Sequence, residues 1–394
     1  MTSNQRVVVV GASIGGLTAA ESLRAEGFEG GILLLGDEAN LPYSRPPLSK
    51  QLLLSGWGEE QVTFRSKKEL DNLGIQFSGG TRAICLDLSK RQVETNLGYQ
   101  AFDELIIATG TKARRMDSEV GVQSLRTLED ALLLRNRMTV ANRIAVIGSG
   151  VLGSEIASAG KLLGAAVTLV GRSNQLSFGA VGTALSSRIQ DLHSANNVNL
   201  HLGSQLLGIV ANGEGASLRF SEGEDLVADL VVAAIGATPC TEWLEGSGLT
   251  LSDGIVCDRQ GMAAAGVYAV GDVASWPDPF NGIPTRVEHQ SNAIEQAIAV
   301  AGTIMRGSMS SPPVPFFWSE IHGVKIKAYG WFDGQPLVEF EKAVQAGSLL
   351  ASRDGVVNRG IVSWDCSPKD FMKARGLLDE SIQQQNHLLT KEQS

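Results

Sequence analysis

The first forty residues constrain the fold of this chain more than any other stretch. Residues 6–10 are an apolar, β-branched run, typical of a strand buried on both faces. A glycine-rich turn, a helical segment over 17–24, an apolar run over 31–35 and the acids Asp37 and Glu38 follow in that order. This unit binds the ADP half of a dinucleotide, because the helix N-terminus offers N–H groups to the phosphates and the acid accepts from ribose hydroxyls. We therefore predict an α/β fold with a Rossmann-like domain.

The turn carries two of the three glycines of this motif. Gly11 allows a tight turn and Gly16 allows the helix to pack on the strand, while Ser13 holds the middle position, where glycine is usual. Serine is the smallest replacement whose hydroxyl can itself meet a phosphate. A lone glycine turn is more often an ordinary loop, so the motif needs independent support.

A second copy of the unit supplies that support. A predicted strand over 144–147 leads into a complete GxGxxG over residues 148–153, and a helix over 154–163 and a strand over 166–170 follow. The first glycines of the two turns lie 137 positions apart (148 minus 11). This copy ends in Gly171-Arg172 instead of an acid. Either the arginine binds a 2′-phosphate, which favours NADPH, or Arg172 is a solvated surface residue and coenzyme specificity is loose.

The composition agrees with two or three domains and excludes several classes. The chain has 394 residues, 43% of them hydrophobic, and its 45 glycines suit repeated strand-to-helix turns. No apolar stretch approaches the ~20 residues of a membrane span, and no signal-peptide pattern precedes the first strand. The net charge of −9 argues against nucleic acid as a partner. The four cysteines have neither CxxC nor metal-ligand spacing, so we expect idle thiols in a reducing cytoplasm and no metal site.

Four further segments have features of ligand contact. Residues 41–50 hold two adjacent prolines beside Arg45 and Lys50, and form either a rigid surface loop or a phosphate- or flavin-binding segment. Predicted strands over 102–110 and 228–239 end in small residues, which either allow close approach to a ligand or simply end a strand. A strand, Gly271-Asp272 and a predicted helix start come later in the chain. That aspartate either binds a sugar hydroxyl or caps a helix.

The remaining elements are predicted from periodicity and composition. We expect helices over 130–138, 292–305 and 369–381, with a polar tail after the last helix. Residues 308–315 contain three prolines and three serines and are interpreted as a linker before a final region of strands.

Together these motifs resemble the FAD-dependent ferredoxin and rubredoxin reductases that serve cytochrome P450 and ring-hydroxylating oxygenases. Of the matching motifs, Arg-Pro-Pro-Leu-Ser-Lys is the most specific to this group, and together they cover residues 11–16, 42–50, 108–110, 125–127, 148–155, 271–273, 288–289 and 316–319. The resemblance implies a glutathione-reductase-like architecture. Its expected parts are a split FAD domain (1–114 and 246–316), an inserted NAD(P) domain (115–245) and a C-terminal α+β domain (317–394).

The resemblance also implies site residues, position by position. The expected FAD contacts are Gly11, Ser13, Ile14, Gly15, Gly16, Asp37, Glu38, Arg45, Lys50, Arg82, Ala83, Ala108, Thr109, Gly110, Arg126, Gly271, Asp272 and Val273. The expected contacts of the nicotinamide nucleotide are Gly148, Gly150, Leu152, Gly153, Arg172, Gly236, Glu288, His289 and Gln290. Lys50 and Glu155 match a pair that meets near flavin N5, and we interpret them as catalytic; an ordinary ion pair is the alternative.

This chain departs from the family pattern at three places. Gln290 stands where tryptophan usually follows Glu-His beside the nicotinamide site. Gly171 replaces the NAD-type acid, and Gly179 replaces an arginine often found a few residues later. Residues 111–114 lack a usual proline. The first two departures bear on the nicotinamide nucleotide, so NADH and NADPH both remain possible donors.

The expected function is electron transfer from NAD(P)H through FAD to a [2Fe-2S] ferredoxin, a rubredoxin or a similar iron–sulfur protein, by a monomer or homodimer in the cytoplasm. Basic side chains that could meet an acidic ferredoxin are Arg114, Arg115, Lys325, Lys327, Lys369, Lys373 and Arg375. The alternatives are an oxidase or small-acceptor reductase of the same fold, a redox-sensing flavoprotein without a catalytic role, and a non-catalytic nucleotide-binding protein.

Overall fold

Two compact units make up the chain. The computed structural model describes residues 5–54, 56–118, 120–213, 215–278, 281–308, 314–332, 336–340, 346–354 and 357–392. The first unit contains residues 1–46, 58–112 and 237–313. The second contains residues 47–57, 113–236 and 314–394.

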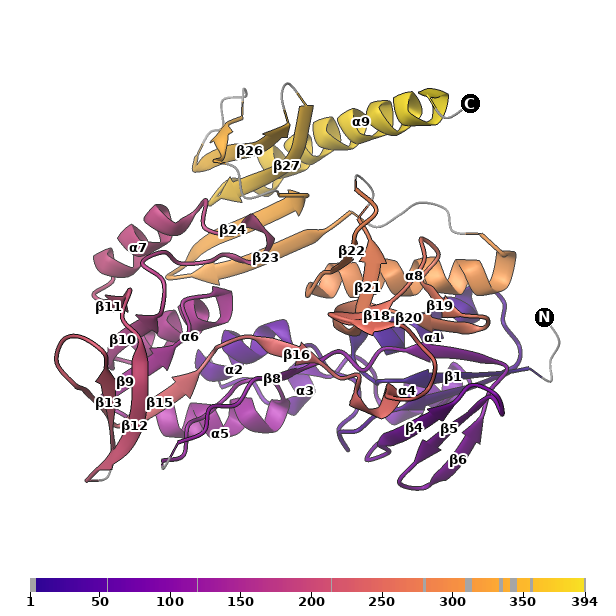
Figure 1. Cartoon of the computed structure of the whole chain (residues 1–394), viewed down its shortest axis with the longest axis horizontal. Coiled ribbons are helices and arrows are strands. Elements are labelled where there is room, and N and C mark those ends of the chain that lie inside the picture. The colour runs from indigo at the N-terminus through magenta and orange to yellow at the C-terminus, as the bar shows by residue number, and fades with distance from the viewer. Residues whose placement is uncertain are drawn as a thin grey trace. The chain divides into compact units, whose positions relative to one another are not determined.

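A six-stranded sheet forms the core of the first unit, in the order β19-β20-β7-β1-β2-β3, and Figure 1 labels its strands β1, β19 and β20. Its strands are β1 (Arg6–Val10), β2 (Gly31–Leu35), β3 (Ile75–Ser78), β7 (Glu104–Ile107), β19 (Met262–Ala264) and β20 (Val267–Ala269). Neighbouring strands pair in parallel except β19 and β20. The valines at positions 7–10 are at most 3% exposed, as expected for a central strand covered on both faces.

Helices and two small sheets complete the first unit. Helix α1 (Ile14–Ala25) packs against α8 (Gln290–Arg306), and the shorter helical segments are α3 (Glu59–Val62), α4 (Lys67–Asn72), η3 (Glu242–Leu244) and η4 (Gly271–Val273). One small sheet contains β4 (Ala83–Asp87), β5 (Gln92–Thr95) and β6 (Gly98–Ala101). The other contains β17 (Leu251–Ser252), β18 (Gly254–Val256), β21 (Ala274–Pro277) and β22 (Pro284–Arg286).

The predicted helix start after Gly271 is wrong. A single 3₁₀ turn leads there into strand β21, because Ala274 and Ser275 pair with β18. Pairing with a distant strand therefore overrides the local signal.

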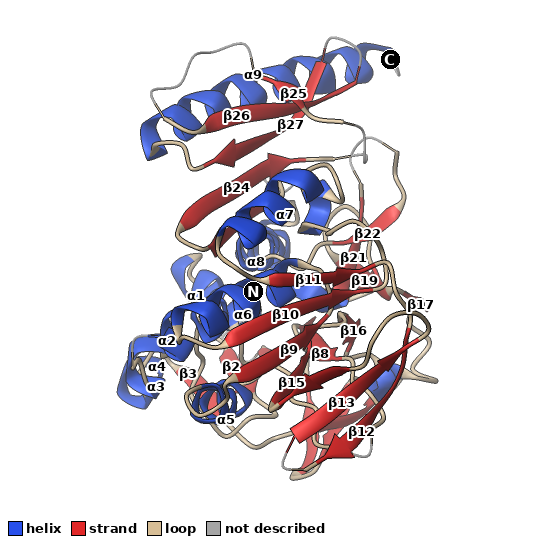
Figure 2. Cartoon of the chain, turned by 90° about the vertical axis from the view of Figure 1, so that its left-hand side faces the viewer, coloured by secondary structure: helices blue, strands red, loops and turns tan. Residues whose placement is uncertain are grey.

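A four-stranded parallel sheet forms the core of the second unit, in the order β11-β10-β9-β15 (Figure 2). Its strands are β9 (Arg143–Ile147), β10 (Ala166–Gly171), β11 (Asn199–Leu202) and β15 (Leu230–Ala233). Helix α6 (Val151–Leu162) packs on β9 and β10, and α7 (Ser186–Ala195) packs on β11. The remaining elements of this part are η1 (Pro46–Ser49), α2 (Gln51–Leu54), α5 (Leu128–Met138), η2 (Gly179–Val181), β12 (Leu206–Asn212), β13 (Gly215–Phe220) and β14 (Leu226–Ala228).

The second unit ends in an antiparallel sheet in the order β23-β24-β27-β26-β25, with α9 packed on β27 (Figure 1). These elements are β23 (Phe316–Ile321), β24 (Val324–Gly330), β25 (Val338–Glu339), β26 (Ser348–Asp354), β27 (Val357–Trp364) and α9 (Pro368–Glu392). The polar tail expected after residue 381 is wrong, because α9 continues to Glu392. A run of polar residues in the sequence does not oppose a helix, since helix propensity depends little on polarity. Residues 309–313 of the predicted linker lie outside the described residues.

The two compact units differ from the predicted domain boundaries. Residues 47–57 belong to the second unit, because α2 packs against α5 and α6. The C-terminal sheet is grouped with the β9–β10 sheet in that unit. The chain changes unit near residues 112 and 237, where β8 (Thr111–Ala113) and β16 (Ala237–Pro239) pair in a two-stranded sheet.

Candidate dinucleotide sites and a buried ion pair

The first glycine turn has the close backbone contacts that a dinucleotide turn requires. Gly11 has φ +113°, and a Cβ there would lie 2.1 Å from the Ala108 carbonyl oxygen. A Cβ on Gly16 would lie 1.9 Å from the Gly11 carbonyl oxygen. Ser13 caps α1, and its side chain makes no hydrogen bond to the first-turn N–H groups. Those donors are therefore not used by the cap and can face an anion.

The second turn repeats this geometry. Gly148 has φ +116°, with its added Cβ 2.1 Å from the Ala234 carbonyl oxygen, and the Cβ of Gly153 would lie 1.9 Å from the Gly148 carbonyl oxygen. The cap residue Gly150 has φ −93° and ψ −170°, and Ser13 has φ −91° and ψ −167°. Serine at the middle position therefore adopts the same extended backbone as glycine, and this departure leaves the turn unchanged.

Open space lies beside the second turn, where a pyrophosphate can approach the backbone. Nothing lies within 4 Å of a Cβ added at Gly150 or at Gly236, so backbone is exposed there for close approach. Position 171 is different, because a Cβ there would lie 2.6 Å from Ser149 Oγ and 2.8 Å from Leu202 Cδ2. Ser149 and Leu202 therefore occupy the space that the side chain of an acid at position 171 would need.

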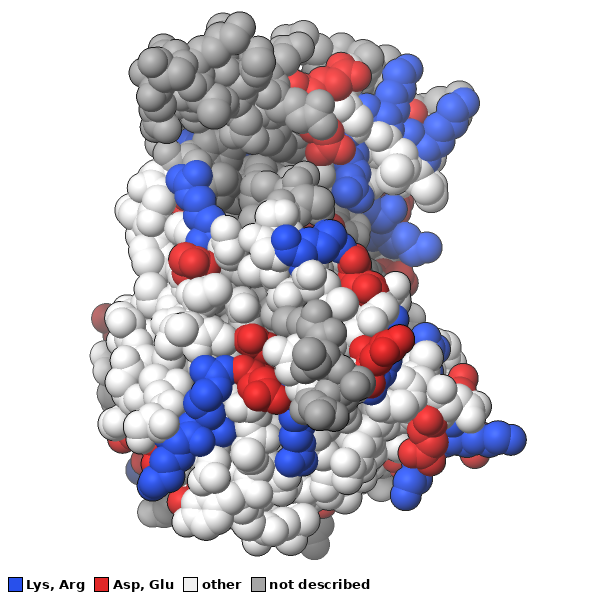
Figure 3. All heavy atoms as spheres, turned by 90° about the vertical axis from the view of Figure 1, so that its right-hand side faces the viewer, with Lys and Arg blue, Asp and Glu red and all other residues white. Residues whose placement is uncertain are grey.

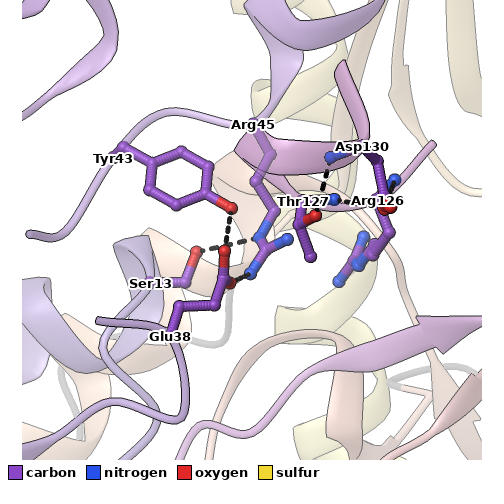
Figure 4. A network of polar contacts seen from close by, with 7 residues as sticks. All are labelled: Ser13, Glu38, Tyr43, Arg45, Arg126, Thr127 and Asp130. Atoms are coloured by element: carbon purple, nitrogen blue, oxygen red, sulfur yellow. Dashed lines mark hydrogen bonds and ion pairs between the residues drawn. The ribbon is translucent and has the colours of Figure 1, made fainter. Parts of the chain in front are cut away.

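The acids after β2 are both held by arginines. Tyr43 Oη donates to Glu38 Oε2 at 2.6 Å, and Arg45 Nη2 lies 2.8 Å from Glu38 Oε1 (Figure 4). Figure 4 shows both side chains converging on this carboxylate from the proline-rich segment. Asp37 lies 2.8 Å from Arg82 Nε on the exposed surface. The predicted residues Arg45 and Arg82 therefore position the two candidate ribose-binding acids of the first unit.

The small-residue strand ends are fixed by hydrogen bonds. Thr109 Oγ1 donates to the Cys240 carbonyl at 3.0 Å, and Gly110 has φ +64°. Ala83 begins β4 beside Arg82.

In the second unit Asp130 accepts from the backbone N–H groups of Arg126 and Thr127 at 3.0 and 2.9 Å, in the capping box of α5 (Figure 4). That box fixes the backbone from which the Arg126 side chain extends.

The Gly271–Val273 turn is supported by a residue that sequence reasoning missed. The Gly271 N–H donates to Gln296 Oε1 at 2.8 Å, and Gln296 is 3% exposed on α8. A glutamine on the buried, alanine-rich face of a helix was the available signal, since buried amides need partners. Arg286 Nη1 donates to the Asp272 carbonyl at 3.2 Å and pairs with Glu288.

His289 caps α8, which begins at Gln290. Burial lowers the pKa of His289 to about 4, although the nearby Asp272 acts in the opposite direction. The imidazole is therefore neutral at pH 7. Glu288, His289 and Gln290 thus lie together at the entry to the helix that packs on α1.

Lys50 and Glu155 form a buried ion pair. Lys50 Nζ lies 2.7 Å from Glu155 Oε1, and the two side chains are 11% and 6% exposed. Ser49 Oγ donates to Glu155 Oε2 and Ser319 Oγ donates to Glu155 Oε1, both at 2.5 Å. The carboxylate thus has three donors from two separate segments, residues 49–50 and Ser319, which offsets the cost of burying its charge.

The ammonium also lies against an aromatic ring. Lys50 Nζ is 4.9 Å from the centre of the Trp318 ring, close enough for a cation–π interaction. Ser49, Trp318 and Ser319 belong to the two sequence motifs Pro-Pro-Leu-Ser-Lys and Phe-Phe-Trp-Ser. Sequence reasoning gave these three residues no role, because only the fold brings the motifs to Glu155.

Two glycine turns of matching geometry, each between a parallel strand and a helix, define an oxidoreductase that binds two dinucleotides. The model of the pyridine nucleotide-disulphide oxidoreductase family matches residues 5–297, and the chain belongs to this family. It uses FAD and NAD(P)H. The four cysteines are all free thiols, at positions 85, 240, 257 and 366.

Similar proteins place the chain among ferredoxin and rubredoxin reductases. It is 32% identical over 384 residues to the ferredoxin–NAD(+) reductase subunit of the benzene 1,2-dioxygenase system of Pseudomonas putida, covering 95% of this chain and 93% of that protein. It is 34% identical over 347 residues to a rubredoxin-NAD(+) reductase of the same species, covering 86% and 89%. Putidaredoxin reductase, in a covalent complex with putidaredoxin, has a TM-score of 0.89 at 28% identity, with 96% and 94% covered. The ferredoxin reductase for the CYP199A2 system of Rhodopseudomonas palustris has a TM-score of 0.86 at 30% identity, with 92% and 91% covered.

Among the described residues, no helix has the length and apolar character needed to cross a membrane.

Proposed function

We propose that this chain passes electrons from NAD(P)H through FAD to a small iron–sulfur protein that serves an oxygenase. The observation that carries the proposal is the pair of matching glycine turns together with the buried Lys50–Glu155 pair. The turn of the first unit, with Asp37 and Glu38, holds FAD; the turn of the second unit holds the nicotinamide nucleotide. The four cysteines, all among the described residues, form no disulfide, which favours the reducing cytoplasm as the location of the protein.

Each group of residues has a role that follows from its chemistry. The N–H groups at the starts of α1 and α6 bind pyrophosphate, and the acids after β2 accept from ribose hydroxyls. When bound, FAD supplies the conversion of a two-electron donor into one-electron deliveries. The Lys50–Glu155 pair holds a fixed charge and exchangeable protons in a mostly buried position, and we place it beside the flavin.

The acceptor is proposed to be a [2Fe-2S] ferredoxin or a similar acidic iron–sulfur protein. Lys325 and Lys327 lie on β24, and Lys369, Lys373 and Arg375 lie on α9. Lys327 Nζ is 5.2 Å from the centre of the Phe371 ring, so this lysine of β24 lies against α9. Figure 3 shows Lys and Arg side chains gathered at the upper right of one face of the molecule. In a chain of net charge −9, such a local group can steer an acidic partner.

The coenzyme preference is proposed to follow from Gly171 and Arg172. Arg172 is exposed directly after the glycine, where a guanidinium can meet a 2′-phosphate. An acid at position 171 is opposed by Ser149, whose Oγ lies 2.6 Å from the added Cβ. We expect Arg172→Ala to raise the Michaelis constant for NADPH about tenfold and to leave that for NADH unchanged. Equal effects on both coenzymes would contradict this assignment.

One series of measurements tests the function. The purified protein should be yellow, and anaerobic addition of NADH or NADPH should bleach the visible band. Turnover with a ferredoxin and cytochrome c should exceed turnover with oxygen alone. Turnover with oxygen or a quinone instead would favour a small-acceptor reductase, and very slow bleaching would favour a redox sensor. A colourless protein would overturn the proposal.

Lys373→Glu tests the docking surface, with Lys68→Glu in α4 of the first unit as a matched control on another helix. We expect only the first to raise the Michaelis constant for ferredoxin, with bleaching by NAD(P)H unchanged in both. The same ferredoxin kinetics in both variants would remove the docking surface from the proposal.

A further inference from the structure

A pocket of about 200 Å³ with both polar and apolar walls adjoins the Lys50–Glu155 pair, entirely within the second unit. Its walls come from α2, one face of α6 and the turn between β23 and β24. Besides the ion pair, the lining includes Gln51, Ser158, Ala159, Leu162, Glu320 and His322. The volume is large enough for several water molecules, and Gln51, Ser158, Glu320 and His322 offer them donors and acceptors.

His322 enters this pocket from a turn that does not need histidine. Ile321 pairs with Val324, so His322 and Gly323 form a two-residue hairpin loop, with φ +49° and +81°. Asn-Gly is the preferred sequence for a loop with two positive φ values. Histidine is tolerated there, but its ring adds contacts that asparagine would not make.

The His322 ring joins the pocket to a second, fully buried histidine. His322 Nε2 lies 3.0 Å from His193 Nδ1 on α7, and one of these nitrogens donates to the other. Burial lowers the pKa of His193 to about 3 and that of His322 to about 4, and Lys161 adds to the effect on His322. Both rings are therefore neutral at pH 7 and can accept a proton briefly.

The proposed reaction produces a proton that has to leave. A hydride carries two electrons and one proton, and an iron–sulfur acceptor takes only electrons. Each NAD(P)H therefore gives NAD(P)⁺, two electrons for two acceptor molecules, and one proton. A site enclosed enough to keep Lys50 and Glu155 at 11% and 6% exposure needs a defined route for that proton.

We propose that this pocket is the proton exit of the enzyme, with Glu155 at its inner end and His322 as a relay toward solvent. The inference rests on the proposed function, which places the ion pair beside the flavin. The proton would leave the reduced cofactor as an O–H bond forms at the Glu155 carboxylate, and that O–H bond breaks as the proton passes to water in the pocket. An N–H bond then forms and breaks at His322, and bulk water takes the proton. The charged and titratable groups around the route are Lys50 directly before α2, Glu155 and Lys161 on α6, His193 on α7, Glu320 on β23 and His322.

Two variants interrupt the route by different means. Ala159→Leu fills the pocket from α6, because Ala159 lines it and is 3% exposed. His322→Asn removes the relay and keeps a residue that the turn prefers. His201→Asn is the matched control, since it removes an imidazole from β11, which does not line the pocket.

The experiment compares proton release with electron transfer in the FAD-loaded protein. An anaerobic stopped-flow reaction with NADH or NADPH and excess ferricyanide, a one-electron acceptor that takes no proton, is followed by a pH-indicator dye and by the visible flavin band. We expect proton release to slow at least about tenfold in Ala159→Leu and His322→Asn, with the bleaching rate unchanged. Added imidazole should restore His322→Asn, a rescue that a purely structural effect would not show.

Several outcomes separate failure of this inference from failure of the proposed function. Proton release that keeps pace with electron transfer in both variants would overturn the exit route. Equal slowing in His201→Asn would also overturn it, because the effect would not depend on the pocket. Wild-type protein that NAD(P)H does not bleach would instead refute the proposed function. If Ala159→Leu does not fold, His322→Asn and its response to imidazole still decide the question.

Discussion

The Lys50–Glu155 pair gives the sharpest test of how this chain tolerates buried charge. Lys50→Met removes the ammonium 2.7 Å from Glu155 and leaves a carboxylate that is 6% exposed. Breaking a buried pair costs ~3–5 kcal/mol of unfolding free energy. Because Ser49 and Ser319 still donate to the carboxylate, we expect the lower end of that range, about 3 kcal/mol.

The double variant Lys50→Met/Glu155→Gln should recover most of this loss. It contains no buried charge, and the glutamine carbonyl can still accept from a serine hydroxyl. We expect it within about 1 kcal/mol of the wild type, because a neutral replacement of a buried pair is often nearly as stable. The coupling between the two sites should then be at least about 2 kcal/mol (3 minus 1) and larger by whatever Glu155→Gln costs alone, so that single variant completes the cycle.

Urea unfolding of the apoprotein at pH 7, followed by circular dichroism, measures these differences. Lys90→Met is the matched control, since Lys90 pairs with Asp87 at 2.8 Å on the surface, where the lysine is 70% exposed. Its unfolding should be indistinguishable from that of the wild type. Additive effects of the two buried substitutions, or a control as damaging as Lys50→Met, would refute the reasoning.

Three further predictions follow from the same structure. The pKa of His193 is about 3 in the folded chain and ~6.5 in the unfolded chain. Between these two pH values the unfolded chain therefore binds more protons than the folded chain. The free energy of unfolding should therefore fall by up to ~1.4 kcal/mol per pH unit as pH drops below ~6.5, and a urea midpoint that rises on acidification would contradict this. Gly150→Ala should leave the apoprotein's urea midpoint unchanged but weaken NAD(P)H binding about tenfold by titration, because its Cβ meets no protein atom and enters the proposed phosphate space; unchanged affinity would argue against that space. Gln296→Leu should cost ~1–3 kcal/mol in urea unfolding, since the buried Gly271 N–H loses its acceptor, and a neutral result would show another partner.

Local patterns predicted both nucleotide units because each is continuous in sequence. The runs at 6–10 and 144–147 are buried strands, and the glycines after them adopt the positive φ and the close contacts that the motif requires. Helix α8 was predicted over 292–305 and spans Gln290–Arg306, because its apolar period and its terminal Gly307 are local signals. The helix expected after Gly271 failed because β21 is specified by its partner strand.

The candidate site also has parts that the local sequence specifies and parts that depend on tertiary packing. The sequence by itself determined two strand–glycine–helix units and therefore two dinucleotide turns, since the strand, the turn and the helix of each unit follow one another directly in the chain. Only the tertiary structure decided that Ser49, Lys50, Glu155 and Ser319 share one buried cluster and that His322 reaches His193. Those partners are separated by more than a hundred positions, and burial, which makes their charges and hydrogen bonds consequential, exists only once the segments have packed.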